Sequence, residues 1–504
     1  MPPSRQLAAR LFAGLLPLTL GQPFTFSAPK HACGVCRELL NGLPCEHFGA
    51  CHVVNASAAQ RRCADFCGSP VATERDEVVP TRRLASSPDV RVVRGFGTKG
   101  YDQIRISVVS QEADPPMDGF FDYSAQFKYR WTDNFLHSAM KSAIPGKVTS
   151  FPLGPGLSVR LPRQGDGTAG VLIGDPCMSA GSIIGWIGCM YGGRFNTYER
   201  TVSLLNAFVP DESTDYWGIL GDNFYDRTGD ISAEVFSRLS MEAKSKFFIT
   251  VPGNHDFWIM GSPTVATVAD QCANGFMQFY AQDAKAAEAV TAGNTLAPFN
   301  FTVDPSDGRH FGLGCNLPAM SNMFWYHQIG NVGLVGQSGA HDLEEAQPFM
   351  VEACAWLAQQ PGLQVAVLVG HWDNQLLGVS TDMGMPHWYH KMAALPGCSD
   401  LDQRGMLKYV MGHTHCNEPH PRGDVGAGFR VGGFGMNGCG NFGIPVLDTT
   451  ESRVRFWYFD TSSDDSYNAV IKCVGQKGWR QCLDLATTWL DQPIPQSSYE
   501  QVLI

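Results

Sequence analysis

Five short apolar runs, each followed by a polar residue, constrain the fold of this 504-residue chain more than any other feature. The runs lead into Asp175, Asp222, Asn254, His371 and His413. Helix-like segments lie between them, at residues 200–208, 231–246 and 343–359. Apolar strands that alternate with amphipathic helices predict an α/β fold whose sheet is covered on both faces. Functional side chains of such sheets gather just beyond the carboxyl ends of the strands, so these polar residues are candidates for one shared site.

The side chains after these strands supply oxygen and imidazole donors and no thiol. The complete candidate set is Asp175, Asp222, Tyr225, Asn254, His255, His371, His413 and His415. Such donors suit iron, zinc or manganese. A single Asp after a strand is more often a turn or helix-cap residue. Several such positions, mostly preceded by a Gly that allows close approach of the backbone, instead indicate a metal site.

Four of the motifs resemble those of calcineurin-like metallophosphoesterases. They are Gly221-Asp222-Asn223-Phe224-Tyr225, Gly253-Asn254-His255-Asp256, Gly370-His371 and Gly412-His413-Thr414-His415. The tyrosine three residues after Asp222 is similar to that of purple acid phosphatases, above all the tartrate-resistant type. The resemblance covers about residues 168–460. It implies a four-layer α/β/β/α sandwich, with a catalytic domain at residues 168–462.

The resemblance also implies a binuclear metal centre. The first metal, ferric iron in this family, would be held by Asp175, Tyr225 and His415. The second, a divalent Fe2+, Zn2+ or Mn2+, would be held by Asn254, His371 and His413. Asp222 would bridge the two metals. His255 would be the catalytic residue, as general acid or hydrogen-bond donor, while a metal-bound hydroxide attacks a phosphomonoester.

One motif departs from the family pattern. The first motif is Gly174-Asp175-Pro176-Cys177 where the family has Gly-Asp-x-Gly, and Pro176 removes one backbone donor beside the site. A further donor histidine of the family has no match, because position 380 is Ser. His327, His387 and His390 are possible substitutes, although a structural or surface role is the better expectation for each. Cysteines that flank the motifs are expected in disulfides or as buried thiols rather than as catalytic thiols, namely Cys177, Cys189, Cys416 and Cys439.

The N-terminal part of the chain predicts entry into the secretory pathway. Residues 1–21 have the basic start and short apolar run of a signal peptide, with a transit peptide or a disordered start as the alternatives. Residues 29–70 hold six cysteines, which predict a disulfide module, although their spacing also permits a zinc site. This module faintly resembles a shortened saposin-like one. Asn55 and Asn300 begin N-glycosylation motifs. A secreted, lysosomal or vacuolar, or cell-surface protein is therefore expected.

Two further regions flank the predicted catalytic domain. Residues 86–165 alternate with a period of two and predict a small β domain or a β extension. Residues 463–504 read as a C-terminal tail in which Cys473 and Cys482 are close enough to pair.

The composition limits the partners. A formal net charge of −11 gives no reason to expect nucleic-acid binding, and no apolar run is long enough for a transmembrane segment. The expected partner is a phosphorylated small-molecule or protein substrate. Two alternatives stay open: a phosphodiesterase on the same scaffold, acting on a sphingomyelin-like lipid or a nucleotide, and a catalytically weak, metal-stabilised binding protein.

Overall fold

The computed structural model describes most of residues 89–495, which belong to one unit of the chain, Arg82–Ile504. The gaps in this description are 95–99, 111, 113–116, 127–134, 154–155, 179–189, 192–194, 227–229, 258–275, 277–322, 340–342, 374–383, 421–425 and 436–438. The predicted signal peptide, the cysteine-rich module, both glycosylation motifs and Cys189 therefore lie outside the described residues.

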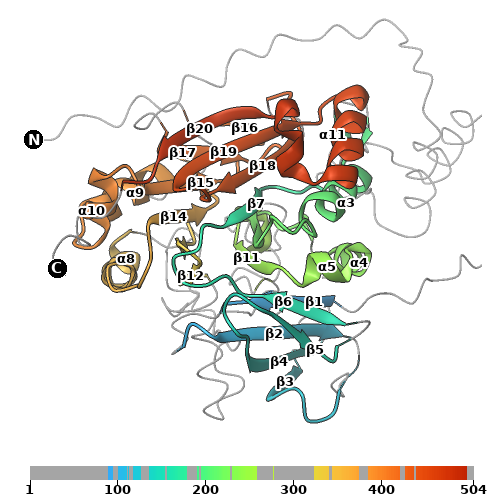
Figure 1. Ribbon diagram of the computed structural model, residues 1–504, viewed down its shortest axis with the longest axis horizontal. Coiled ribbons are helices and arrows are strands. Elements are labelled where there is room, and N and C mark those ends of the chain that lie inside the picture. The colour runs from blue at the N-terminus through green and yellow to red at the C-terminus, as the bar shows by residue number, and fades with distance from the viewer. Residues whose placement is uncertain are drawn as a thin grey trace, which may run out of the picture. The chain divides into compact units, whose positions relative to one another are not determined.

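Two β-sheets form the centre of the described unit (Figure 1). The ten-stranded sheet has the order β20 (Thr487–Pro493), β19 (Arg453–Asp460), β18 (Gly443–Asp448), β7 (Ala169–Ile173), β10 (Tyr216–Leu220), β11 (Phe247–Val251), β1 (Asp89–Val93), β2 (Gln103–Ser110), β4 (Phe135–Ser142) and β3 (Tyr123–Gln126). The six-stranded sheet has the order β12 (Trp325–Ile329), β13 (Val332–Gly336), β14 (Val365–Gly370), β15 (Leu407–Met411), β17 (Gly428–Val431) and β16 (Asn417–Pro419). Two hairpins complete the strands: β5 (Val148–Phe151) with β6 (Leu157–Arg160), and β8 (Met190–Tyr191) with β9 (Phe195–Asn196).

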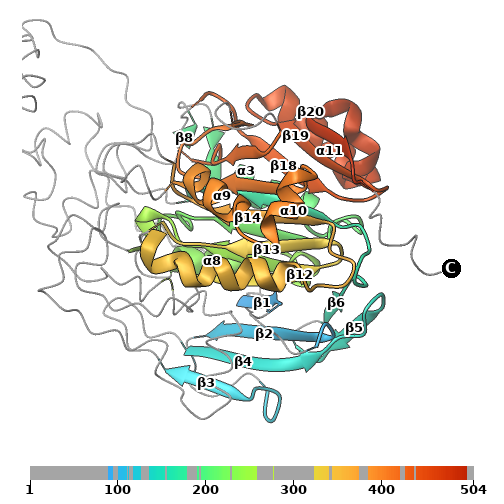
Figure 2. The ribbon, with the colours of Figure 1, turned by 90° about the vertical axis from the view of Figure 1, so that its left-hand side faces the viewer.

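Helices cover the outer face of each sheet (Figures 1 and 2). The helices on the six-stranded side are α8 (Leu343–Leu357), α9 (Met385–Ala393) and α10 (Cys398–Gln403). Those on the ten-stranded side are α3 (Thr197–Phe208), α4 (Asp230–Arg238), α5 (Met241–Lys244) and α11 (Asp464–Lys477). Two 3₁₀ helices are η2 (Asn254–Phe257) and η4 (Trp479–Leu485). The predicted four-layer α/β/β/α arrangement is confirmed. Among the described residues, no helix has the length and apolar character needed to cross a bilayer.

Two regions flank the central strands, and both are joined to the ten-stranded sheet. Strand β1 pairs in parallel with β11, so β1 to β4 form a β extension of this sheet, which is one of the two predicted alternatives. Residues 463–495 are not a plain tail, because α11 packs on α3 and β20 pairs with β19 at the opposite edge of the sheet. Short-range periodicity specifies a strand but not its distant partner, so the pairing of β20 with β19 had no signal in the sequence.

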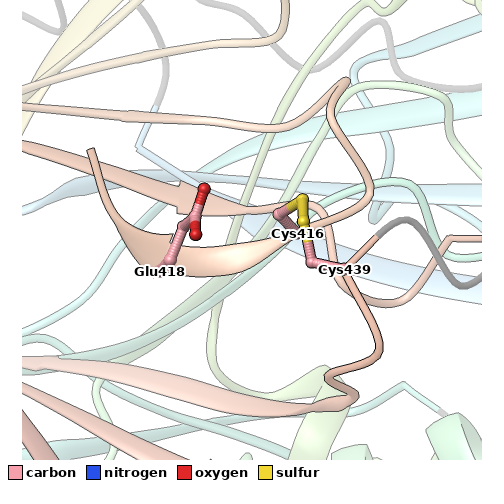
Figure 3. A group of neighbouring side chains, drawn as sticks. All are labelled: Cys416, Glu418 and Cys439. Atoms are coloured by element: carbon pink, nitrogen blue, oxygen red, sulfur yellow. A yellow bond between two sulfur atoms is a disulfide. The ribbon is translucent and has the colours of Figure 1, made fainter. Parts of the chain in front are cut away.

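Disulfides join several segments of this unit. Cys354 in α8 is bonded to Cys398 at the start of α10, and Cys473 is bonded to Cys482, as its spacing predicted. Cys416 is bonded to Cys439, beside Glu418 (Figure 3). Cys177 is disulfide-bonded as well. Each described cysteine thus takes part in a disulfide, and none of them offers a free thiolate as nucleophile.

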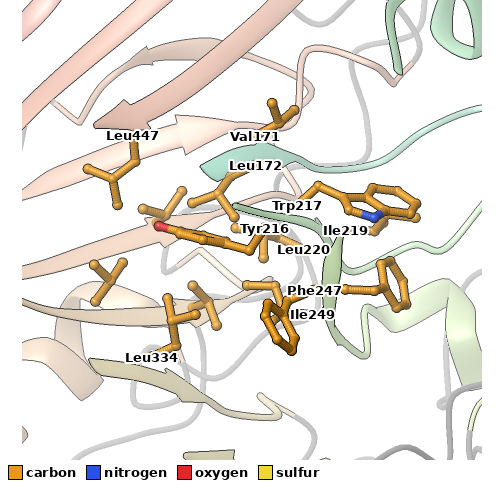
Figure 4. Close-up of a cluster of buried hydrophobic side chains, with 14 of the residues drawn as sticks. Val171, Leu172, Tyr216, Trp217, Ile219, Leu220, Phe247, Ile249, Leu334 and Leu447 are labelled. Carbon is orange, nitrogen blue, oxygen red and sulfur yellow. The ribbon is translucent and has the colours of Figure 1, made fainter. Parts of the chain in front are cut away.

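The core lies between and around the central strands. Strands β7, β10, β11, β14 and β15 are buried along their whole length, as expected of strands with both faces covered. Figure 4 shows Tyr216 and Trp217 of β10 packed among apolar side chains from both sheets, such as Leu447 and Leu334. The indole of Trp325 in β12 donates a hydrogen bond of 2.9 Å to the carbonyl of Thr250 in β11, which links the two sheets directly.

Candidate metal centre

The candidate ligands follow the carboxyl ends of parallel strands in both sheets. Strand β10 pairs in parallel with β7 and with β11, and β14 pairs in parallel with β15. The ten-stranded sheet contributes Asp175, Asp222, Tyr225, Asn254 and His255, and the six-stranded sheet contributes His371, His413 and His415. Parallel pairing brings these ends to the same edge, so residues far apart in sequence come within contact of one another.

Sharp turns after the strands aim the side chains inward. Among the described residues, eight non-glycine residues have a positive φ, and they include Asp175 (57°), Asp222 (51°), Tyr225 (53°), His413 (70°) and His415 (53°). Each such conformation costs of order 1–3 kcal/mol for a residue with a Cβ, and such residues concentrate at functional sites. Their concentration among the predicted ligands indicates that the surrounding fold enforces this geometry.

Two glycines allow the turns to approach closely. A Cβ on Gly412 would lie 2.6 Å from Oδ2 of Asp175, and a Cβ on Gly253 would lie 2.2 Å from the backbone nitrogen of Asp222. Both distances are far below van der Waals contact. These positions therefore require glycine if the carboxylates are to stay where they are.

One group of donors surrounds Asp175. Oδ1 of Asp175 lies 3.4 Å from Nε2 of His415 and 3.4 Å from the hydroxyl of Tyr225. The Tyr225 hydroxyl is 2.8 Å from the same His415 nitrogen. Oδ2 of Asp175 accepts a hydrogen bond of 2.7 Å from the backbone N–H of His413, which fixes the carboxylate. Asp175, Asp222 and His415 offer ligand atoms within 4.8 Å of one another, close enough to share one cation.

A second group of donors faces a common point. Oδ1 of Asn254 lies 3.1 Å from Nε2 of His371 and 3.1 Å from Nδ1 of His413, and the two imidazole nitrogens are 3.1 Å apart. Nδ1 of His371 lies 2.9 Å from the carbonyl oxygen of Leu220, so it carries the proton and donates it there. Nε2 of His371 is then the nitrogen that offers its lone pair to a cation when it gives up its proton.

Asp222 lies between the two groups. Its Oδ1 is 3.4 Å from Nε2 of His371, on the side of the second group. The same oxygen accepts a hydrogen bond of 2.8 Å from the backbone N–H of His255, while Nε2 of His255 lies 3.9 Å from Oδ2. The position of Asp222 is that of a carboxylate able to bridge two cations.

Burial and charge shift the titration of these groups. Burial disfavours the charged form of Asp222, but the imidazoles of His371 and His255 outweigh it and hold the pKa of Asp222 well below the usual carboxyl range. Burial likewise opposes protonation of His371, yet the carboxylates of Asp222 and Asp175 raise its pKa to about 9. A cation that binds here therefore competes with a proton on His371.

Tyr225 is buried, whereas His255 is only partly buried. Burial, together with Asp222 and Asp175, raises the pKa of Tyr225 well above its ordinary value, so the phenol keeps its proton until a cation displaces it. The ring of His255 packs edge-on against Tyr225 at a centroid distance of 4.6 Å. Burial lowers the pKa of His255, and its side chain keeps 16% exposure, so substrate can reach it.

A buried carboxylate that the sequence analysis did not single out ties two ligand loops together. Asp256 accepts hydrogen bonds from the backbone N–H and the side-chain amide of Asn223, at 3.0 and 2.9 Å, and from the backbone N–H of Gly253 at 2.6 Å. Asn223 adjoins Asp222, and Gly253 adjoins Asn254. Both residues stand inside the recognised motifs, which is the signal that could have identified them.

Other candidates lie elsewhere. His327 is buried in β12 and stacks on Trp325, and no described contact joins it, His387 or His390 to the ligands. Cys416, Glu418 and Cys439 gather with the spacing of metal ligands, but the two sulfurs are bonded to each other (Figure 3). This second cluster therefore has no thiolate to bind a metal.

Comparison with protein-family models identifies the segment that contains these ligands. Residues 171–417 match the model of the calcineurin-like phosphoesterases, so this part of the chain is a calcineurin-like phosphoesterase domain. The family resemblance predicted from the motifs is confirmed at this level. A comparison of the sequence with curated proteins found no match.

Solved structures of low sequence identity are also similar to the chain. A purple acid phosphatase from yellow lupin (Lupinus luteus) seeds is 15% identical, with a TM-score of 0.42, over 75% of this chain and 73% of that chain. A dimetal phosphatase from Danio rerio is 12% identical, with a TM-score of 0.31, over 59% of this chain and 96% of that chain. Vacuolar protein sorting 29 from Cryptosporidium parvum is 11% identical, with a TM-score of 0.23, over 59% and 92%.

Proposed function

We propose that this calcineurin-like phosphoesterase domain hydrolyses phosphomonoesters at a two-metal centre. The observation that carries the proposal is the pair of donor groups joined by Asp222. Asn254, His371 and His413 present three donor atoms at mutual distances of 3.1 Å, and Asp175, Tyr225 and His415 form the other group. Without a cation, a proton on His371 has to separate these donor atoms, in agreement with the raised pKa of His371.

In this proposal the two donor groups would hold cations, and His255 would transfer a proton. Two bound cations would activate water at neutral pH and offset the charge of the phosphoryl oxygens. The backbone N–H of His255 holds the carboxylate of Asp222, which would be shared by both cations. The partly exposed His255 stands beside this carboxylate, where it donates a proton to the leaving oxygen of the ester.

The nature of the donors supports two different cations. A phenol, a carboxylate and an imidazole, from Tyr225, Asp175 and His415, suit ferric iron, and we assign that metal to the first group. An amide oxygen and two imidazoles, from Asn254, His371 and His413, suit a divalent cation such as Fe2+, Zn2+ or Mn2+. This assignment agrees with the motif-based resemblance to purple acid phosphatases.

The disulfides support a place in the secretory pathway. Bonds such as Cys354–Cys398 and Cys473–Cys482 persist in oxidising compartments and are rare in the cytosol. Secreted, lysosomal or vacuolar, and cell-surface locations all share this chemistry.

The experiment that tests this function compares two ester classes. Purified full-length protein with quantified iron and zinc is assayed on one aryl phosphomonoester and its matched aryl phosphodiester, from about pH 5 to 8, where metal-bound water ionises. We expect turnover of the monoester with two metals per chain. Preference for the diester would replace the proposal with a phosphodiesterase, and full metal loading without turnover would replace it with a binding role.

A further inference from the structure

A buried arginine connects the segments that carry the six-stranded sheet's ligands. Arg430 lies in β17, where it pairs with Met411 at the end of β15 and with Glu418 in β16. Met411 comes two residues before His413, so this position adjoins the root of one ligand loop. Strand pairing alone therefore places Arg430 close to the centre, without making it a ligand.

The guanidinium joins two carboxylates from different loops. Nη2 donates to Oδ2 of Asp373 at 2.8 Å, and Nη1 donates to Oε1 of Glu418 at 2.7 Å. The side chains of Arg430 and Asp373 are 9% and 1% exposed, so little water screens the pair. The planar fork of arginine suits two such contacts at once, whereas lysine carries a single point charge.

We propose that Arg430 is a positioning residue for the metal ligands. Asp373 comes two residues after His371, and Glu418 comes three residues after His415. By holding both carboxylates, Arg430 fixes the loop after β14 relative to the segment after β15, and thereby fixes His371 relative to His413 and His415. The inference rests on the proposed metal centre. Arg430 lies outside the four family motifs.

The burial of Asp373 makes its ion pair with Arg430 important for the position of the loop. Asp373 is fully buried, and within the described part of the chain its Oδ1 has no hydrogen-bond partner. Loss of Arg430 would leave a buried carboxylate without a counter-charge, an arrangement that is strongly unfavourable. Movement of the loop toward water relieves this unpaired charge, and that movement carries His371 away from Asn254 and His413.

The test is titration of metal-free, full-length protein with Zn2+ in competition with a chromophoric chelator. For Arg430→Met we expect affinity at the second position to fall about tenfold, as for residues that orient metal ligands. Arg430→Lys keeps the charge but holds one carboxylate at a time, so we expect an intermediate affinity with near-normal thermal stability. Should Arg430→Met fail to fold, the Lys variant carries the test.

A second buried arginine supplies the matched control. Arg455 in β19 likewise joins two carboxylates, Asp448 and Glu451, and its side chain is 11% exposed. Arg455→Met should lower the melting temperature and leave Zn2+ affinity unchanged. The inference is overturned if the Arg430 variants bind Zn2+ like wild type, or weaken binding no more than Arg455→Met. If the wild type binds no Zn2+, the proposed function fails, and the inference fails with it.

Discussion

His371 shows how a single side chain is prepared for a cation. Its Nδ1 is held at 2.9 Å by the carbonyl of Leu220, the last residue of β10, although His371 itself follows β14 in the other sheet. This contact fixes both the tautomer and the direction of the ring. A backbone oxygen that no motif contains thus takes part in shaping the site.

The role of His255 predicts a split between metal binding and rate. His255→Ala removes the proton donor but none of the ligand atoms, so we expect full metal content and a loss of about 10²-fold in kcat for alkyl phosphates. Aryl phosphates have better leaving groups and should lose much less. Parallel assays of an alkyl and an aryl monoester check this, and equal losses on both would contradict the role as acid.

If Tyr225 is an iron ligand, its replacement should change the visible spectrum of the iron-loaded protein. The Tyr225 hydroxyl lies 2.8 Å from Nε2 of His415 and 3.4 Å from Oδ1 of Asp175, so under the proposed assignment it would be a ligand of ferric iron. Iron-loaded wild type should therefore be violet, and Tyr225→Phe should be colourless with the divalent metal retained. A visible spectrum with metal analysis decides the point, and a violet Tyr225→Phe protein would remove Tyr225 from the ligand set.

His327 predicts a pH dependence of stability that has nothing to do with the metals. Burial, reinforced by Arg94, lowers the pKa of His327 to about 3, and neither ring nitrogen has a hydrogen-bond partner among the described residues. The unfolded chain therefore binds more protons than the folded one between pH 3 and about 6.5, and stability falls as pH decreases through this range.

Replacement of His327 by leucine should remove that loss. At about pH 5 we expect His327→Leu to be more stable than wild type by about 2 kcal/mol, with a much smaller difference at pH 8. Denaturant unfolding at both pH values measures this, and the exposed His390→Gln serves as control. A difference that does not depend on pH would show that packing, rather than titration, dominates at this position.

At the scale of elements, the sequence predicts the central strands themselves but not which distant strands pair with them. β7, β10, β11, β14 and β15 are mostly apolar runs, and such runs identify strands buried on both faces. β20 is half-exposed and lacks a run of this kind, so its pairing with β19 had no local signal. The link from Asp256 to Asn223 depends on how two loops meet, which spacing along the chain does not specify.

We expect the disulfide after His415 to slow the loss of metal. Cys416 is bonded to Cys439, and the intervening segment packs on the ligand: a Cβ on Gly435 would lie 2.6 Å from the ring of His415. Replacing both cysteines with serine frees this segment, so the first metal should be lost faster during dialysis against a chelator. The matched Cys473→Ser/Cys482→Ser variant should retain metal, because η4 and α11 contribute no ligand. Equal loss from both variants would contradict the prediction.

At the scale of the whole molecule, the centre lies where the two sheets meet. Asp222 follows a strand of the ten-stranded sheet, and its carboxylate reaches His371, which follows a strand of the six-stranded sheet, at 3.4 Å. Ligands from both sheets mean that a bound cation also holds the two sheets together. The sequence predicted the eight candidate residues from five separate strand ends, since each motif carries its own local signal.

The decisive experiment measures the metal content and turnover of Asp222→Asn beside the wild type. We expect two metals per chain and hydrolysis of an aryl phosphomonoester for wild type. For Asp222→Asn we expect a clear loss of both metals and at least about 10³-fold slower turnover, since two-metal chemistry requires the bridge. Wild-type metal content and wild-type turnover in Asp222→Asn would show that Asp222 does not join the two donor groups of the centre.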